Sequence, residues 1–149
     1  MTVTIERVSG ADLDLDEVLT VYRESGLGER RPIDDRPRFA QMLANANLVI
    51  TARVDGVLTG IARSVSDFAY TTYLSDIAVV KDLQHGGIGR ALIAATQDAA
   101  PGAKIVLLSA PAATKYYPHV GFRAHDSAWV LDPGVSPARP LAASTANTL

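Results

Sequence analysis

A cluster of glycines at residues 86–89 carries the clearest chemical signal in the sequence. Gly86, Gly87 and Gly89 follow an apolar stretch and lie where a helical pattern begins. Glycines at a strand-to-helix turn let the backbone bend tightly and aim several N–H groups at one point beside the helix N-terminus. Fixed N–H donors of this kind bind phosphate groups. We therefore expect residues 84–90 to form a binding site for a pyrophosphate.

Two common pyrophosphate-binding motifs do not fit the spacing of these glycines. A P-loop requires Lys-Ser or Lys-Thr directly after its final glycine, but Arg90 and Ala91 follow Gly89. A Rossmann site requires G-x-G-x-x-G in a parallel βαβ unit, whereas the spacing here is G-G-x-G and the preceding elements form a meander. The alternative without a ligand is a helix start whose glycines allow close packing.

Two segments of the sequence together resemble the GNAT superfamily of N-acetyltransferases. Gln84, Gly87 and Gly89 match its acyl-CoA signature, Gln/Arg-x-x-Gly-x-Gly/Ala. Residues 113–122 are similar to its A-x-x-x-Y-x-x-x-G-F segment, with Tyr117 at the tyrosine. The resemblance covers most of the chain and implies an enzyme that transfers an acetyl group from acetyl-CoA to an amine.

The resemblance implies a role for each part of the glycine-rich region. Backbone groups of one loop would bind the pyrophosphate, namely those of Gln84, His85, Gly86, Gly87, Ile88, Gly89 and Arg90. The pantetheine arm would lie between two splayed strands, at residues 73–80 and 104–109. A backbone N–H near Ala78 or Val79 would polarise the thioester carbonyl, because a fixed donor stabilises the oxyanion that develops there.

Tyr117 would then be the acid that protonates the CoA sulfur. A phenol and a thiol differ by about two pKa units, so this proton transfer is chemically reasonable. The alternative for Tyr117 is a structural tyrosine that packs a short helix on the sheet. Two positions depart from the family pattern: Ala110 replaces an asparagine that often bonds the pantetheine, and Pro118 replaces a polar helix residue.

The acceptor amine must lose a proton before it can attack the thioester. An alkylammonium with a pKa near 10.4 costs about 4–5 kcal/mol to deprotonate at pH 7, so a general base would help. Asp76 is the candidate base, and a buried strand-end carboxylate is an equally open interpretation of it. Tyr73 is a candidate acceptor-binding residue. Three loop aspartates could attract a cationic amine or simply be solvated: Asp34, Asp35 and Asp67.

A mixed α/β layer must position these residues. The apolar patterns predict strands at residues 3–8, 48–54, 57–63, 73–80, 104–108 and 122–131. The last of these ranges can hold one or two closing strands. They predict helices at residues 15–22, 37–46, 88–99 and 111–117, and Pro118 should end the last helix. With the resemblance, the fold class is α/β: a central, mostly antiparallel sheet with one parallel splayed strand pair and about four flanking helices.

Local signals define the ends of the early elements. The first helix has two candidate caps and two candidate stops: Asp12 or Asp14, and Gly26 or Gly28. Pro37 fits the first turn of the second helix. The Asp55-Gly56 pair between two apolar runs predicts a tight hairpin, since both residues tolerate positive φ.

The composition is that of one ordinary globular domain. The chain has 149 residues, 48% of them hydrophobic and 20% charged, with a net charge of −2. No stretch is apolar enough for a membrane span or a signal peptide, so we expect a cytoplasmic protein with neither membrane nor nucleic-acid partners. Residues 1–131 should form the acetyltransferase domain, and residues 132–149 a Pro/Ala-containing tail that is flexible or docked.

The absence of cysteine narrows the chemistry. It excludes disulfides, Cys-ligated metals and a thiol nucleophile, and it also excludes an acetyl-cysteine intermediate. We therefore expect direct transfer from acetyl-CoA to the amine. The resemblance implies a primary amine on a small molecule as the acceptor, and no metal. Acetylation of a protein N-terminus or lysine stays open, as does a non-catalytic acyl-CoA-binding regulatory domain. A homodimer is compatible with the sequence.

Overall fold

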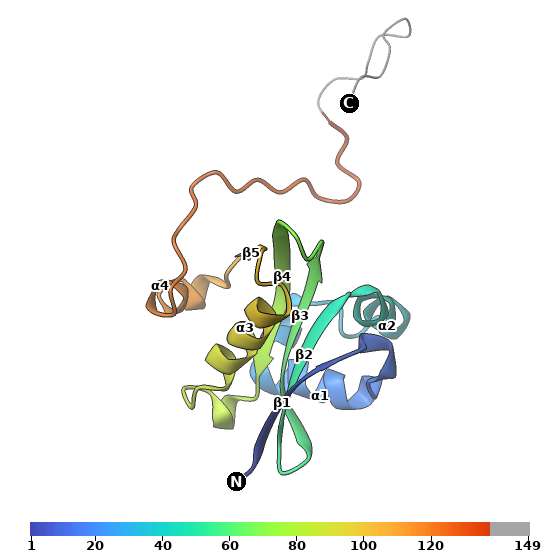
Figure 1. Cartoon of the computed structure of the whole chain (residues 1–149). Helices are drawn as coiled ribbons and strands as arrows, with labels where there is room; N and C mark the ends of the chain where they lie inside the picture. Colours follow the sequence, from blue (N-terminus) through green and yellow to red (C-terminus); the bar gives the residue numbers. More distant parts are fainter. Residues whose placement is uncertain (138–149) are drawn as a thin grey trace, which may run out of the picture. The chain divides into compact units, whose positions relative to one another are not determined.

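The computed structural model describes residues 1–137. Two inner strands of its sheet form the hairpin that the Asp55-Gly56 pair predicts. Both turn residues have positive φ, 49° and 83°, and they join β2 (Leu48–Val54) to β3 (Val57–Ser66). β1 (Val3–Val8), β4 (Thr71–Val79) and β5 (Lys104–Val106) complete a sheet of order β1-β2-β3-β4-β5 (Figure 1). Only β4 and β5 are parallel, so the predicted mostly antiparallel sheet with one parallel pair is confirmed.

Helices cover both faces of the sheet. Val49 packs with residues of α1 (Leu15–Ser25) and α2 (Arg36–Asn45), whereas Leu48 and Ile50 pack with residues of α3 (Ile88–Ala99). Successive side chains of a strand point to opposite faces. Therefore α1 and α2 lie on one face of the sheet and α3 lies on the other (Figure 1).

The helix ends follow local signals. Asp14 caps α1 by accepting a backbone N–H of the first turn at 2.9 Å, and Gly26 ends the helix with a φ of 90°. Asp35 caps α2 by accepting the N–H of Arg38 at 3.2 Å, with Pro37 in the first turn. The structure thus selects Asp14 and Gly26 from the two pairs of candidates.

A β-bulge at Ser75 changes the face to which the end of β4 points. Arg63 pairs with Asp76, and the next residue of β3 pairs with Leu74, so Ser75 has no partner on β3. Leu74 packs on the α3 face, whereas Asp76 faces α1. In a regular strand these two residues would share a face, so the bulge is what turns Asp76 toward α1.

β4 and β5 are paired at one end only. Their ladder runs from Thr71 opposite Lys104 to Tyr73 opposite Val106. Beyond Tyr73, residues 74–79 have no strand partner on that side within the described part of the chain. β5 is therefore shorter than predicted, and β4 has an open edge that leads toward the glycine loop.

The chain divides into two units, Met1–Thr114 and Lys115–Leu149. The predicted domain boundary at residue 131 stays a prediction. Residues 138–149 of the predicted tail lie outside the described residues. Every helix in residues 1–137 is too short or too polar to span a lipid bilayer.

Two predictions for the C-terminal part are wrong. The helix expected at residues 111–117 is two pieces, η4 (Pro111–Ala113) and α4 (Tyr116–His119), and Pro118 lies inside the second. Proline fits a first helical turn because the N–H it lacks has no intrahelical partner there. Residues 122–131 form no strand, since their apolar pattern is short and the run at residues 129–131 is exposed, with no ladder to satisfy it.

Candidate active site

The glycine loop joins β4 to α3 through backbone conformations of alternating hand. η3 (Lys81–Leu83) follows β4, and residues 84–87 lead into α3. His85 and Gly87 have positive φ values of 68° and 92°, whereas Gly86 between them does not. Alternation of this kind turns successive N–H groups toward one concavity.

Six consecutive N–H groups at this loop have no backbone acceptor. Ala91 is the first residue of α3 with a bonded N–H, which donates to the Gly87 carbonyl at 3.0 Å. The unbonded donors, counted within residues 1–137, are those of His85, Gly86, Gly87, Ile88, Gly89 and Arg90. Free donors at the positive end of a helix dipole attract an anion. The loop is therefore equipped to hold a pyrophosphate.

Gln84 holds this loop against the end of β4. Its side-chain amide donates to the Val79 carbonyl at 2.8 Å and to the Ser25 carbonyl at 3.5 Å. Because Ser25 is the last residue of α1, one side chain connects α1, β4 and the loop. Gln84 thus shapes the candidate site through its side chain.

The open edge of β4 presents a free backbone donor at Val79. The N–H of Val80 donates to the Thr59 carbonyl of β3 at 2.9 Å, and the pairing is regular there, with Val79 opposite Gly60. Donors along an antiparallel strand point alternately to its two sides. The N–H of Ala78 is therefore used in the ladder with β3, and that of Val79 points to the open edge.

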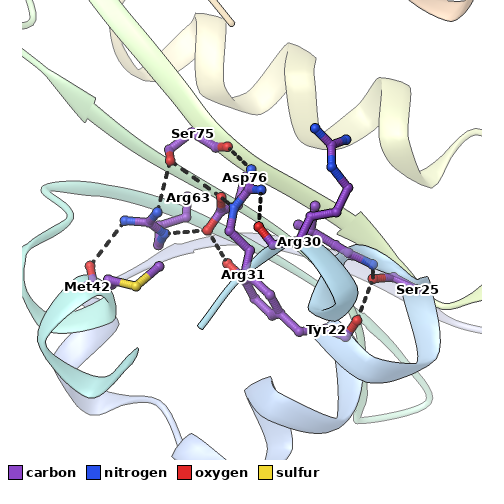
Figure 2. Close-up of polar contacts among 9 residues, drawn as sticks. Tyr22, Ser25, Arg30, Arg31, Met42, Arg63, Ser75 and Asp76 are labelled. Carbon is purple, nitrogen blue, oxygen red and sulfur yellow. Dashed lines mark hydrogen bonds and ion pairs between the residues drawn. The ribbon is translucent and has the colours of Figure 1, made fainter. Parts of the chain in front are cut away.

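Asp76 lies at the centre of a buried ion-pair network (Figure 2). The residue is 1% exposed, and its carboxylate accepts hydrogen bonds from the Nε atoms of Arg31 and Arg63, both at 2.6 Å. The Tyr22 hydroxyl donates to the same carboxylate at 2.7 Å. Arg31 also donates to the Ser75 carbonyl, and Arg63 to the Ser75 hydroxyl, each at 2.9 Å. The network ties α1, the segment before α2, and β3 to the bulge of β4.

The network sets the protonation states of its members. Burial acts to raise the pKa of the Asp76 carboxyl, but the hydrogen bond and charge of Arg63, followed by Tyr22 and Arg31, hold it below its ordinary value. Burial, and then the charge of Asp76, raise the pKa of Tyr22 well above the ordinary value. A carboxylate with a lowered pKa and four side-chain donors around it is a weak proton acceptor. This geometry favours the buried structural carboxylate over the general base.

The sequence patterns do not identify the partners of Asp76. One signal was present: Arg63 lies inside the apolar run of β3, where a buried guanidinium needs a carboxylate or carbonyl partner. Tyr22 has the spacing of an ordinary core residue of α1, and Arg31 follows η2 (Leu27–Arg30) in a polar loop. Neither of these two positions indicates an ion-pair network.

Tyr73, the candidate acceptor-binding residue, lies in an exposed apolar row across three strands. Val65 on β3 and Val106 on β5 are its cross-strand neighbours. Val65, Tyr73 and Val106 are 50%, 41% and 44% exposed. The row borders the bulge at Ser75, so it can contact a ligand at the open edge of β4.

Two of the three loop aspartates have structural partners. Asp67 accepts backbone N–H groups from the three residues at 69–71, at 2.7 to 3.0 Å, and these bonds, that from Tyr70 foremost, lower its pKa. Asp35 caps α2, and Asp34 is exposed. Solvated loop and cap positions therefore account for these acids. Residues 1–137 hold no cluster of three or more side chains of the metal-binding types.

Tyr117 lies in α4, in the second unit, among aromatic rings. Its ring packs edge-on against Tyr116 and Phe122, with centroid distances of 5.3 and 5.5 Å. Burial, and then the electrostatic effect of neighbouring Tyr116, raise the pKa of the Tyr117 phenol. The phenol is thus protonated at neutral pH, as a proton donor must be.

The sequence matches a protein-family model but no curated protein sequence. A family model for the acetyltransferase (GNAT) domain matches residues 18–135. A comparison with curated proteins gives no match.

Several solved structures have the same fold. A GNAT-family acetyltransferase from Streptococcus pneumoniae is 19% identical, over 87% of this chain and 98% of that chain, with a TM-score of 0.70. An N-acetyltransferase from Thermoplasma acidophilum in complex with coenzyme A is 16% identical, over 86% and 94%, with a TM-score of 0.67. An aminoglycoside acetyltransferase from an uncultured soil metagenomic sample is 20% identical, over 90% and 97%, with a TM-score of 0.65. Because the family model spans most of the chain, the protein belongs to the GNAT acetyltransferase family and is an acetyl-CoA-dependent N-acetyltransferase.

Proposed function

We propose that this enzyme transfers the acetyl group of acetyl-CoA directly to the primary amine of a small molecule. The proposal rests on one observation: unbonded backbone N–H groups lie both in the glycine loop and along the open edge of β4 that leads to it. Residues 85–90 offer free N–H groups for a pyrophosphate, and β4 offers a free donor at Val79. When bound, acetyl-CoA supplies the activated acetyl group as a thioester.

Direct transfer is supported by the absence of cysteine, which leaves no thiol to carry the acetyl group between the substrates. The amine nitrogen forms a bond to the carbonyl carbon, and the carbon–sulfur bond breaks. The Val79 N–H stabilises the oxyanion that develops on the carbonyl oxygen. The acceptor nitrogen loses two protons to water, one before it attacks and one as the amide forms. Tyr117 donates its proton to the departing sulfur and regains one from solvent.

Asp76 has a positioning role in this proposal. Its ion pairs with Arg31 and Arg63 hold the bulge of β4, and the bulge sets the direction of the strand that ends at Val79. Tyr73 and its exposed apolar neighbours form one wall for the acceptor. The likeness to a structure named as an aminoglycoside acetyltransferase supports an acceptor of low molecular weight.

The test combines ligand binding with release of CoA thiol. The melting temperature is measured with CoA and with acetyl-CoA, and free thiol is measured across small amines and lysine-containing peptides. We expect both cofactor forms to raise the melting temperature and small amines to release thiol. Release with peptides alone would point to a protein acetyltransferase, and binding without any release to a non-catalytic domain. No shift with either form would refute the binding site.

Gly87→Ala is expected to weaken acetyl-CoA binding about ten- to hundredfold, by disturbing one or two charge-assisted hydrogen bonds. Gly87 has a φ of 92°, and an added Cβ would meet no atom within 4 Å, so the change strains the turn without a clash. Gly56→Ala is a matched control, since Gly56 has a φ of 83° and equally open surroundings but lies in the β2–β3 turn. Calorimetric titration should give weaker binding for Gly87→Ala only, and equal weakening in both variants would contradict the assignment.

A further inference from the structure

An open cavity of about 330 Å³ lies between α2 and β3. Arg63 and Val65 alternate along β3 and so share the α1–α2 face of the sheet. The residues from α2 recur at the spacing of one helix face. The side chains that line the cavity include Arg38, Gln41, Met42 and Asn45 from α2, and Arg63 and Val65 from β3.

The cavity has an excess of positive charge. Its lining includes two guanidinium groups and no carboxylate. Arg63 is paired with Asp76, but Asp76 is also paired with Arg31, so one carboxylate serves two cations. Arg38 makes no ion pair within the described part of the chain, and the carboxylate of nearby Asp35 accepts the backbone N–H of Arg38 as the α2 cap.

Polar donors complete the lining. Gln41 and Asn45 present side-chain amides next to Arg38, whereas Met42 and Val65 supply apolar surface. Guanidinium groups bind carboxylates through paired, charge-assisted hydrogen bonds, and amides can add further donors. An acceptor that carried a second ammonium group into this cavity would be repelled by the guanidinium groups of Arg38 and Arg63.

Arg63 connects this cavity to β4, because it donates to the hydroxyl of the bulge residue Ser75 at 2.9 Å. Ser75 and Val79 are separated along β4 by about 13 Å at the usual rise per strand residue. The exposed side chain of Tyr73 lies beside Val65 at the cavity edge. A ligand that reaches both places needs an extended chain between its amine and its other end.

We propose that this cavity binds a carboxylate at the far end of the acceptor, so that the preferred acceptor is an amine with a remote acid group and not a polyamine. This specificity rests on the proposed N-acetylation. The apolar row with Tyr73 contacts the chain between the two ends, and Arg38 provides the unpaired cation that meets the carboxylate.

Three series of acceptors test this specificity: ω-amino acids, alkylamines and diamines of increasing, matched length. They differ only in the charge of the far end, and kcat/KM is measured by thiol release. We expect the ω-amino acids to be the best series by about tenfold or more at the optimal length, and the diamines to be the poorest. Equal values for acids and alkylamines, or a preference for diamines, would overturn the proposal.

Two arginine variants locate the effect. Arg38→Gln should raise KM for the ω-amino acids about ten- to hundredfold and leave the alkylamines unchanged. Arg36→Gln removes the same charge from the same helix, but Arg36 pairs with Asp16 and does not line the cavity, so both series should be unaffected. Equal loss for acids and alkylamines in Arg38→Gln, or the same loss in Arg36→Gln, would contradict a carboxylate site.

Direct binding separates this proposal from the proposed function. Calorimetry with an ω-amino acid and the matched alkylamine needs no turnover. Binding of the acid to the wild type, weakened in Arg38→Gln, upholds the cavity site even if no amine is acetylated. Failure of the acid to bind, with or without CoA present, overturns the site even if other amines are acetylated.

Discussion

Asp76→Asn is expected to lower the free energy of unfolding by about 3–5 kcal/mol, the usual effect of removing one partner from a buried ion pair. The change leaves the guanidinium groups of Arg31 and Arg63 without their shared carboxylate, and both bond to it at 2.6 Å. The amide of asparagine adds donors where Arg31, Arg63 and Tyr22 already donate. Urea denaturation at neutral pH measures the loss.

Asp16→Asn is the matched control for this prediction. Asp16 also bonds an arginine, Arg36, at 2.6 Å, but the two side chains are 77% and 53% exposed. Exposed ion pairs contribute little because water screens them, so this variant should lose less than about 1 kcal/mol. Similar losses in the two variants would mean that burial of Asp76 does not govern its contribution.

The pH dependence of this effect has a definite sign. The pKa of Asp76 is lower in the folded protein than in the unfolded chain. Its contribution to stability is therefore complete above the unfolded value of about 3.9 and is lost as the pH falls through the lower folded value. The stability difference between wild type and Asp76→Asn should be constant near neutral pH and shrink only in acid.

Activity measurements distinguish a positioning role for Asp76 from that of a general base. The variant is assayed at a temperature where it is folded, and kcat/KM is followed as the pH rises toward the pKa of the amine. A positioning residue leaves the shape of this profile unchanged while the rate falls. Disappearance of an acidic limb in Asp76→Asn would instead assign the base to Asp76.

The parts of the fold that the sequence predicted correctly are those with local signals. The Asp55-Gly56 turn, the Asp14 cap and the Gly26 stop each act within a few residues, through preferences of single residues for φ or for capping. The turn from β4 into α3 belongs to the same class, because its three glycines are close in sequence, and the pyrophosphate site there stays a prediction. The closing strand expected within residues 122–131 had no such support, since a strand needs a partner that its own residues do not specify.

The surroundings of Asp76 depend on contacts between distant residues. Tyr22 lies on the first helix and Arg31 lies in a loop, and they reach Asp76 only because the bulge at Ser75 turns it to the α1 face. A bulge shifts the register by one residue, which moves a side chain to the other face. The sequence shows no local sign of that shift. From the sequence alone, Asp76 can therefore be interpreted equally well as a general base or as a buried structural carboxylate.

Tyr117→Phe is expected to lower kcat about a hundredfold or more, the usual contribution of a positioned general acid. The substitution removes only the hydroxyl and keeps the ring that packs against Tyr116 and Phe122. The expelled thiolate must then take its proton from water. Because the hydroxyl acts on the leaving group and not on cofactor binding, the dissociation constant for acetyl-CoA should stay within a fewfold of the wild-type value.

Tyr116→Phe is the control, since it removes a hydroxyl from the adjacent residue of the same short helix. Single-turnover thiol release with saturating acetyl-CoA and amine measures the chemical step in both variants. The raised pKa of Tyr117 means that the wild-type phenol stays protonated beyond the ordinary tyrosine value of about 10, so the loss in Tyr117→Phe should be constant across neutral pH. If Tyr117→Phe turned over like Tyr116→Phe, the tyrosine would be a packing residue of α4, and water would be the proton donor.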